Sequence, residues 1–181
     1  MNMFLGMCSH RGIGFKKSLP CRLTVIDKLF NKTTMGRGNN ALIMGRKTFW
    51  RFPTLPDRKC LVLSEKKGLS SKNNLFFENK HTLYQHLDEK NYDDVWVVGG
   101  ESIFKTFLNE PKLTKINIIE IDAYFMCDKF FPQIPDTFVL TKTGEWEKEE
   151  NIKYRNVQYE KLEFSSLRNK FAEPIYSDFL R

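Results

Sequence analysis

Cysteine and histidine are scarce in this sequence of 181 residues, and neither residue type forms a ligand pattern. The cysteines are scattered without a Cys-x-x-Cys pair, at Cys8, Cys21, Cys60 and Cys127. The three histidines are equally dispersed, at His10, His81 and His86. This spacing favours free thiols in a reducing compartment over disulfides or zinc, and it predicts no metal site.

Long apolar runs are also missing, since none approaches the roughly 18 residues that span a membrane. The opening segment, MNMFLGMCSHRGIG, becomes polar too early for a secretory signal. We therefore expect a cytoplasmic protein without a membrane partner. There is no internal repeat and no low-complexity linker.

A hydrophobic content of 41% and an aromatic content of 14% indicate a packed globular chain, long enough for one domain. The net charge of +7 favours anionic partners, which include a phosphorylated cofactor, a polyanionic substrate or nucleic acid. A charged, solvated surface without a specific partner explains the same balance. Composition does not choose among these.

Apolar runs with strand character alternate with segments of helical spacing. Strands are predicted at 2–8, 40–45, 59–64, 94–100 and 115–125, and helices at 22–33, 46–52, 82–91 and 101–110. Residues 136–150 and 152–164 resemble a closing antiparallel pair. This order predicts an α/β sheet that is parallel in its middle and antiparallel at its C-terminal edge.

Two glycine turns follow apolar strands and open helices. The sequence MGRKT (44–48) offers a glycine, two cations and a hydroxyl, and VVGGES (97–102) repeats the arrangement with two glycines. Backbone N–H groups at such helix starts suit phosphate oxygens, and glycine allows close approach. The pair suggests a dinucleotide bound without the G-x-G-x-x-G fingerprint.

Landmarks in order along residues 2–164 make the chain resemble the dihydrofolate reductase family. They are GIG (12–14), LP (19–20), Phe30, TT (33–34), IMGRKT (43–48), LPDR (55–58), LVLS (61–64), VWVVGG (95–100), FFP (130–132) and IKY…YEK (152–161). The resemblance implies an eight-stranded, mostly parallel sheet with about four helices. It also implies NADPH as hydride donor and dihydrofolate as acceptor.

The resemblance further implies roles for individual residues. NADPH would be held by Gly45, Arg46, Lys47, Thr48, Ser64, Gly99, Gly100, Glu101, Ser102 and Ile103. The folate would meet apolar walls at Phe30 and Phe52, and Arg58 would fork onto the α-carboxylate of its glutamate tail.

The catalytic corner departs from the family pattern. The acid of the first helix commonly lies six residues after the Pro and four before a Phe, and Ile26 occupies that place. The threonine that orients the acid is replaced by Ile119. Asp27 is the neighbouring candidate acid, but one residue on a helix is about 100° of rotation. Two further expected residues, a Trp and a Tyr, are replaced by Cys21 and Phe104.

Two hypotheses follow. In the first, the chain is a non-catalytic binding or regulatory module, and NADPH binding has weakened or been lost. RNA or a ribonucleoprotein is a candidate partner, because the chain is basic and its C-terminal extension (165–181) carries Arg168, Lys170, Phe171, Tyr176, Phe179 and Arg181. The alternative for this extension is a C-terminal helix docked on its own domain, which is the more common arrangement. In the second, it is an active, divergent NADPH-dependent dihydrofolate reductase that uses a re-aimed Asp27 or takes the proton for N5 from water. A reductase of another substrate, such as a pterin or pyrimidine derivative, is the remaining alternative.

Overall fold

The computed structural model describes residues 1–162 except 17, 22, 53–54 and 67–69. The predicted extension at 165–181, including the tail residues on which an RNA partner would depend, lies outside the described residues, so the boundary at 164 remains an expectation. Among the described helices, none combines the length and apolar character that a membrane span requires.

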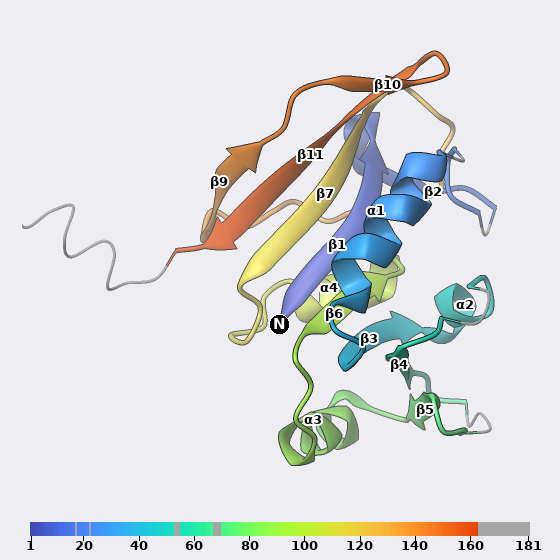
Figure 1. The fold of residues 1–181 in the computed structure, drawn as a ribbon, viewed down its shortest axis with the longest axis vertical. Coiled ribbons are helices and arrows are strands. Elements are labelled where there is room, and N and C mark those ends of the chain that lie inside the picture. Colours follow the sequence, from blue (N-terminus) through green and yellow to red (C-terminus); the bar gives the residue numbers. More distant parts are fainter. Residues whose placement is uncertain (17, 22, 53–54, 67–69, 163–181) are drawn as a thin grey trace, which may run out of the picture.

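One mixed sheet organises the chain (Figure 1). Its continuous path of eight strands runs β10-β11-β7-β1-β6-β3-β4-β5. Three further strands, β2, β8 and β9, pair at its margins. The strands are β1 (Asn2–Cys8), β2 (Gly12–Gly14), β3 (Asn40–Gly45), β4 (Arg58–Leu63), β5 (Asn74–Phe77), β6 (Val95–Gly99), β7 (Lys115–Asp122), β8 (Lys129–Phe130), β9 (Phe138–Thr143), β10 (Glu147–Glu149) and β11 (Ile152–Lys161).

The pairing confirms the predicted α/β sheet. Strands β7, β1, β6, β3, β4 and β5 run parallel to one another along this path, whereas β11 runs antiparallel to β7. The eight-strand expectation matches the continuous path, and the three marginal strands bring the connected sheet to eleven. Strand β5 and the short β2 and β8 were not predicted, because four residues or fewer carry little periodic signal.

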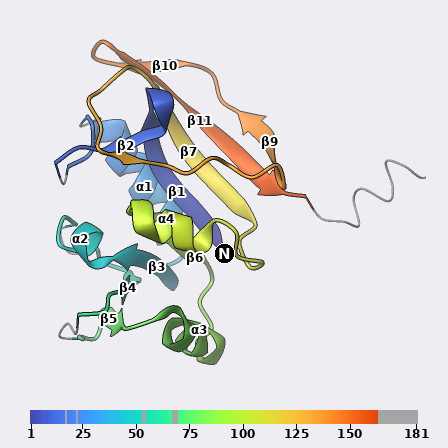
Figure 2. The ribbon, with the colours of Figure 1, turned by 180° about the vertical axis from the view of Figure 1, so that it is seen from behind.

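Four α-helices flank the sheet within the described residues. They are α1 (Thr24–Met35), α2 (Arg46–Phe49), α3 (Lys80–Glu89) and α4 (Glu101–Phe107), and a short 3₁₀ turn, η1 (Ser9–Arg11), separates β1 from β2. Helix α1 crosses the front of the sheet in Figure 1, and the view from behind in Figure 2 shows α4 against the opposite face.

Alternation along the central strands produces two cores. On β1, Met3 and Leu5 belong to the core beneath α3 and α4, whereas Phe4 belongs to the core beneath α1. The period of two in strand side chains explains this division. The second core contains Ile26 and Phe30 of α1, so the predicted helical phase is confirmed.

Candidate functional site

The two glycine turns, about fifty residues apart in the chain, meet at the carboxyl ends of β3 and β6. A Cβ atom built on Gly100 would lie 3.3 Å from Thr48 Oγ1, and one on Gly45 would lie 3.1 Å from Ile103 Cγ1. Each turn therefore faces the first residues of the other turn's helix. The strands align here, with Met44 opposite Gly99. Glycine at both positions therefore allows the two turns to pack closely against each other.

The second turn requires glycine on conformational grounds as well. Gly99 has φ +103°, in the region that side-chain-bearing residues rarely adopt. A Cβ there would also lie 2.9 Å from Cε2 of the buried Phe104 ring. The phenylalanine that replaces the expected tyrosine thus packs directly beneath the turn.

Polar and charged groups border this junction. Arg46, at the start of α2, is partly exposed, and Lys47 is exposed. Glu101 and Ser102 begin α4, where Glu101 forms an ion pair with Lys105 at 2.8 Å. Ser64 lies one residue beyond β4, where its hydroxyl donates to the Lys66 carbonyl at 2.9 Å and accepts from the Lys66 amide.

Two phenylalanines predicted to line the folate cleft are in contact. The rings of Phe30 and Phe52 stack with centroids 5.1 Å apart and an interplanar angle of 13°. Phe4 meets Phe30 edge to face at 5.7 Å. A flat ligand ring would enter between Phe30 and Phe52 only after the two rings separate, because stacked aromatic rings leave no room for a third.

Arg58 is buried beside this aromatic pair, 3% exposed. Its guanidinium donates to Thr34 Oγ1 at 2.9 Å, Asn31 Oδ1 at 3.0 Å and the Pro56 carbonyl at 3.2 Å. Burial lowers the pKa of this guanidinium. Three of the five N–H donors of Arg58 are therefore bonded to α1 and to the loop before β4. These bonds fix the orientation of the guanidinium group.

The place of the expected acid is apolar. Ile26 is 6% exposed and Ile119 is fully buried, and both belong to the same core. Gly6, paired with Ile119 across β1 and β7, receives Ile26: a Cβ on Gly6 would lie 3.2 Å from Ile26 Cδ1. The two isoleucines therefore border one spot on the sheet, and neither can donate or accept a proton.

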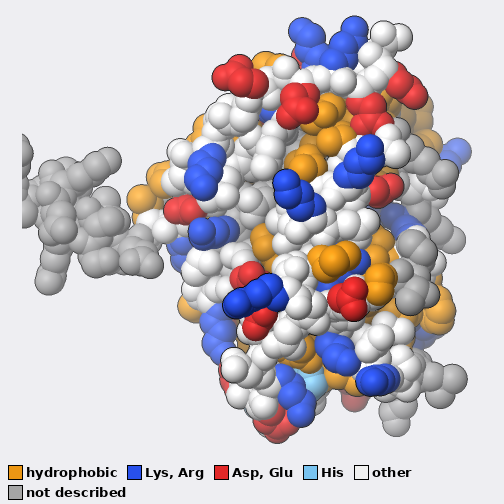
Figure 3. Space-filling view, viewed as in Figure 1, with side chains coloured by type: hydrophobic (Ala, Val, Ile, Leu, Met, Phe, Trp, Pro, Cys, Tyr) orange, Lys and Arg blue, Asp and Glu red, His pale blue; other side chains and the backbone are white. Residues whose placement is uncertain are grey.

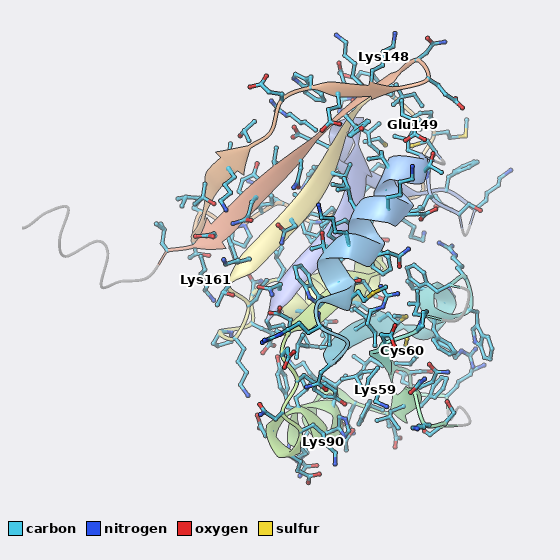
Figure 4. All side chains as sticks on the ribbon, in the orientation of Figure 1. Lys59, Cys60, Lys90, Lys148, Glu149 and Lys161 are labelled. Atoms are coloured by element: carbon cyan, nitrogen blue, oxygen red, sulfur yellow. The ribbon has the colours of Figure 1, made fainter. Side chains whose placement is uncertain are left out.

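Asp27, the alternative acid, is exposed on α1. The carboxylate that contacts this helix is Glu149, at the end of β10 (Figure 4). Glu149 accepts from the Thr24 amide at 2.8 Å, the Val25 amide at 2.9 Å and the Thr24 hydroxyl. The hydrogen bond from the Thr24 side chain is the main cause that lowers the pKa of Glu149. Glu149 thereby satisfies backbone N–H groups at the start of α1 that have no partner within the helix. The sequence did not predict this contact, because Thr24 and Glu149 lie 125 positions apart in the chain.

A cavity of about 350 Å³ lies next to the cleft, beyond α2. It is lined by Phe49, Trp50, Phe52, Leu55, Cys60, Ser71, Lys72, Asn73 and Asn74. Its thiol, Cys60, is buried, and burial raises the pKa of that thiol to about 11. A protonated thiol is a poor nucleophile, so Cys60 does not make this cavity a reactive site.

The described residues hold no group of three or more His, Cys, Asp and Glu side chains arranged to bind a metal ion. On the face drawn in Figure 3, basic and acidic side chains are interspersed rather than gathered by sign. That face therefore presents no continuous basic surface of the kind that follows a nucleic acid backbone.

The fold and the paired turns define an α/β protein of the class that binds ligands at the carboxyl ends of parallel strands. Comparison with known proteins makes the assignment specific. The family described as dihydrofolate reductase matches residues 1–161. The chain belongs to the dihydrofolate reductase family.

Three relatives illustrate the similarity, and each is named dihydrofolate reductase. The protein of Drosophila melanogaster is 35% identical over 148 residues, covering 76% of this chain and 81% of the relative. The protein of Aedes albopictus is 29% identical over 180 residues, covering 89% and 97%. The protein of Rattus norvegicus is 29% identical over 187 residues, covering 89% and 97%. None of these three names refers to RNA.

Proposed function

We propose that the chain is an NADPH-dependent reductase of dihydrofolate in which the proton comes from water rather than from a side chain. The observation that carries the proposal is the close meeting of the two glycine turns at the carboxyl ends of β3 and β6, where a Cβ at Gly45 or Gly100 would crowd Ile103 or Thr48. Family membership over residues 1–161 supports the same reaction.

The cofactor fits the residues present. Gly45, Gly100 and the backbone N–H groups that follow them would hold phosphate oxygens, and Arg46 and Lys47 would balance their charge. When bound, NADPH supplies the hydride. Glu65, exposed one residue after Ser64, would repel a 2′-phosphate there, and the neighbouring Lys66 offsets it.

The substrate would lie along α1. Phe30 and Phe52 would separate and enclose its aromatic parts, and Arg58, already oriented by Thr34 and Asn31, would meet its α-carboxylate. Ile26 and Ile119 would cover the pterin end with methyl groups. These exclude water from one side of the ring but supply no proton.

Proton delivery from solvent has a defined pH signature. General acid catalysis by a positioned side chain contributes about 10²–10⁴-fold, so turnover without it should be slow. The rate should rise as pH falls, approaching about tenfold per pH unit, because the protonated substrate then forms in solution.

The test follows NADPH oxidation with dihydrofolate, using purified full-length protein from weakly acidic to weakly alkaline pH. We expect slow turnover that increases toward acid and that Asp27→Asn leaves unchanged within about twofold. Loss of turnover in Asp27→Asn would overturn the solvent-proton mechanism, because it would make Asp27 the acid.

The buried pair Ile26 and Ile119 favours a second candidate, a binding or regulatory module without turnover. An unpaired buried hydroxyl would cost about 1–3 kcal/mol, so replacing both acid and threonine by isoleucine stabilises a fold freed from catalysis. In the same assay this candidate gives no NADPH oxidation at any pH, and titration detects weak NADPH binding or none.

A further inference from the structure

Two thiols distant in sequence lie in contact at the end of β1. Cys8 Sγ and Cys127 Sγ are 3.6 Å apart, and the Cys8 thiol also donates to the Gly12 carbonyl at 3.3 Å. Cys8 is the last residue of β1, and Cys127 lies in the connection between β7 and β8. Both thiols are free in this structure. The separation is one small movement away from the S–S bond length of about 2.05 Å.

The backbone holds these sulfurs opposite each other from both sides. The Ser9 amide donates to the Ala123 carbonyl at 3.1 Å, and the Asp128 amide donates to the Gly14 carbonyl at 2.9 Å. These bonds tie the β1–β2 corner to the segment that carries Cys127. Backbone hydrogen bonds on both sides therefore hold the two cysteine-bearing segments next to each other.

Gly12 provides the space that the sulfurs occupy. A Cβ atom built on this residue would lie 2.4 Å from Cys127 Sγ and 2.8 Å from Cys8 Sγ, closer than real Cβ contacts. Its backbone is extended, with φ −68°, so conformation alone does not require glycine here. Glycine is needed at position 12 because a side chain there would collide with the two sulfur atoms.

We propose that Cys8 and Cys127 form a reversible intramolecular disulfide when the protein meets a peroxide, making the end of β1 an oxidation site. Cys127 is partly exposed and reacts first, whereas Cys8 is 2% exposed and resolves the product. The reaction consumes one peroxide for each disulfide formed.

The steps balance as follows. The Cys127 thiolate attacks one peroxide oxygen, the O–O bond breaks, and hydroxide leaves, so that Cys127 becomes a sulfenic acid. The Cys8 sulfur then attacks the sulfenic sulfur, forms the S–S bond and expels the oxygen as hydroxide. The two thiol protons convert the two hydroxides into two waters. Two electrons pass from the thiols to the peroxide.

The environment of Cys8 assigns it the second step. Burial is the main cause that raises the pKa of Cys8 to about 11, so it remains a thiol at neutral pH and does not itself attack an oxidant. Within contact distance of a sulfenic sulfur it reacts as an intramolecular group, which compensates for weak ionisation.

A third cysteine, Cys21, is an alternative disulfide partner for Cys127. Cys21 is partly exposed, and burial raises the pKa of its thiol to about 11 as well. Cys21 also interacts electrostatically with Cys127, so a bond between Cys21 and Cys127 is the competing product.

The test treats reduced, full-length protein with a small excess of hydrogen peroxide, blocks remaining thiols by alkylation, and maps peptides without reduction. We expect one linked pair, Cys8–Cys127, with a mass decrease of one hydrogen molecule and full reversal by dithiothreitol. The oxidised protein should melt about 4 °C or more above the reduced protein, because the bond closes a long loop of the unfolded chain.

Cysteine-to-serine variants test which thiol performs each step. Cys8→Ser should leave Cys127 as a sulfenic acid that dimedone traps, whereas the matched control Cys60→Ser should cross-link like the parent protein. Mapping the parent protein decides the matter even if Cys8→Ser fails to fold. A Cys21–Cys127 link, an intermolecular link, or no link after Cys127 has been oxidised would each overturn the proposal.

Discussion

Gly6 of β1 and Ile26 of α1 face each other so closely that a Cβ built on Gly6 would lie 3.2 Å from Ile26 Cδ1. The first helix therefore contacts the sheet through an aliphatic side chain at the point where the family places an acid. Because Gly6 pairs with Ile119, the same spot lacks the orienting hydroxyl. This arrangement motivates the first prediction.

Restoring both polar groups should restore proton delivery. We expect Ile26→Glu combined with Ile119→Thr to raise dihydrofolate turnover at neutral pH by about 10²-fold, the lower end of what a positioned acid contributes. NADPH oxidation measures the rate. Asp27→Glu is the matched control, because its carboxylate lies on the exposed side of α1 and should change little. A double variant that binds NADPH yet turns over no faster would contradict this reading of the corner.

Arg58 should serve both the fold and the substrate carboxylate. Arg58→Ala removes three hydrogen bonds from a buried charged group and should lower the free energy of unfolding by about 2–4 kcal/mol, measured by urea denaturation. Arg58→Lys keeps the charge but loses the fork, so it should weaken dihydrofolate binding more than binding of a pteridine without the glutamate tail. Equal loss for both ligands would contradict a carboxylate contact.

The contact between the two glycine turns predicts a specific defect in cofactor binding. Gly100→Ala would place a Cβ 3.3 Å from Thr48 Oγ1, between the two turns rather than in the core. We expect NADPH affinity to fall by at least about tenfold, which is about 1.4 kcal/mol. Protein fluorescence during NADPH titration measures it. Gly144→Ala is the matched control, because its added Cβ would lie 3.2 Å from the Asn156 carbonyl oxygen, a contact of similar tightness away from the glycine turns. Unchanged NADPH affinity in Gly100→Ala would contradict the placement.

Glu149 should make the stability of α1 depend on pH. Its folded-state pKa is lowered from 4.5, chiefly by the Thr24 side-chain hydrogen bond. A lowered folded pKa contributes stability above the unfolded value, and this contribution is lost as pH falls through the folded value. Glu149→Gln should therefore melt below the parent protein at neutral pH, and the difference should shrink at pH below 4.5. Glu150→Gln, an exposed neighbour, is the control. A melting difference that persists in acid would point to packing rather than charge.

Local pattern predicted most of the central sheet and the phase of its first helix. Ile26 and Phe30 are four residues apart, so one buried face of α1 followed from helical spacing, and the exposure of Asp27 followed with it. The glycine turns were predictable individually because each follows a buried strand. Their meeting was not, since it depends on the order in which β3 and β6 pair.

Contacts between distant segments were beyond sequence reasoning. The bond of Glu149 to the start of α1 joins a hairpin to a helix formed long before it in the chain. The cysteines looked scattered because Cys8 and Cys127 are 119 positions apart, and the pairings of β1 with β7 and of β2 with β8 bring their segments together. A regular pattern in the sequence reports one element at a time.

The aliphatic lining at Ile26 and Ile119 also affects which inhibitors this cleft would accept. A cationic heterocycle that relies on a buried carboxylate for its affinity would have to shed its hydration shell against methyl groups alone, at a cost of several kcal/mol. Uncharged ring systems face no such penalty. Selective inhibition should therefore begin from neutral compounds, and resistance to charged ones should be intrinsic to the chain.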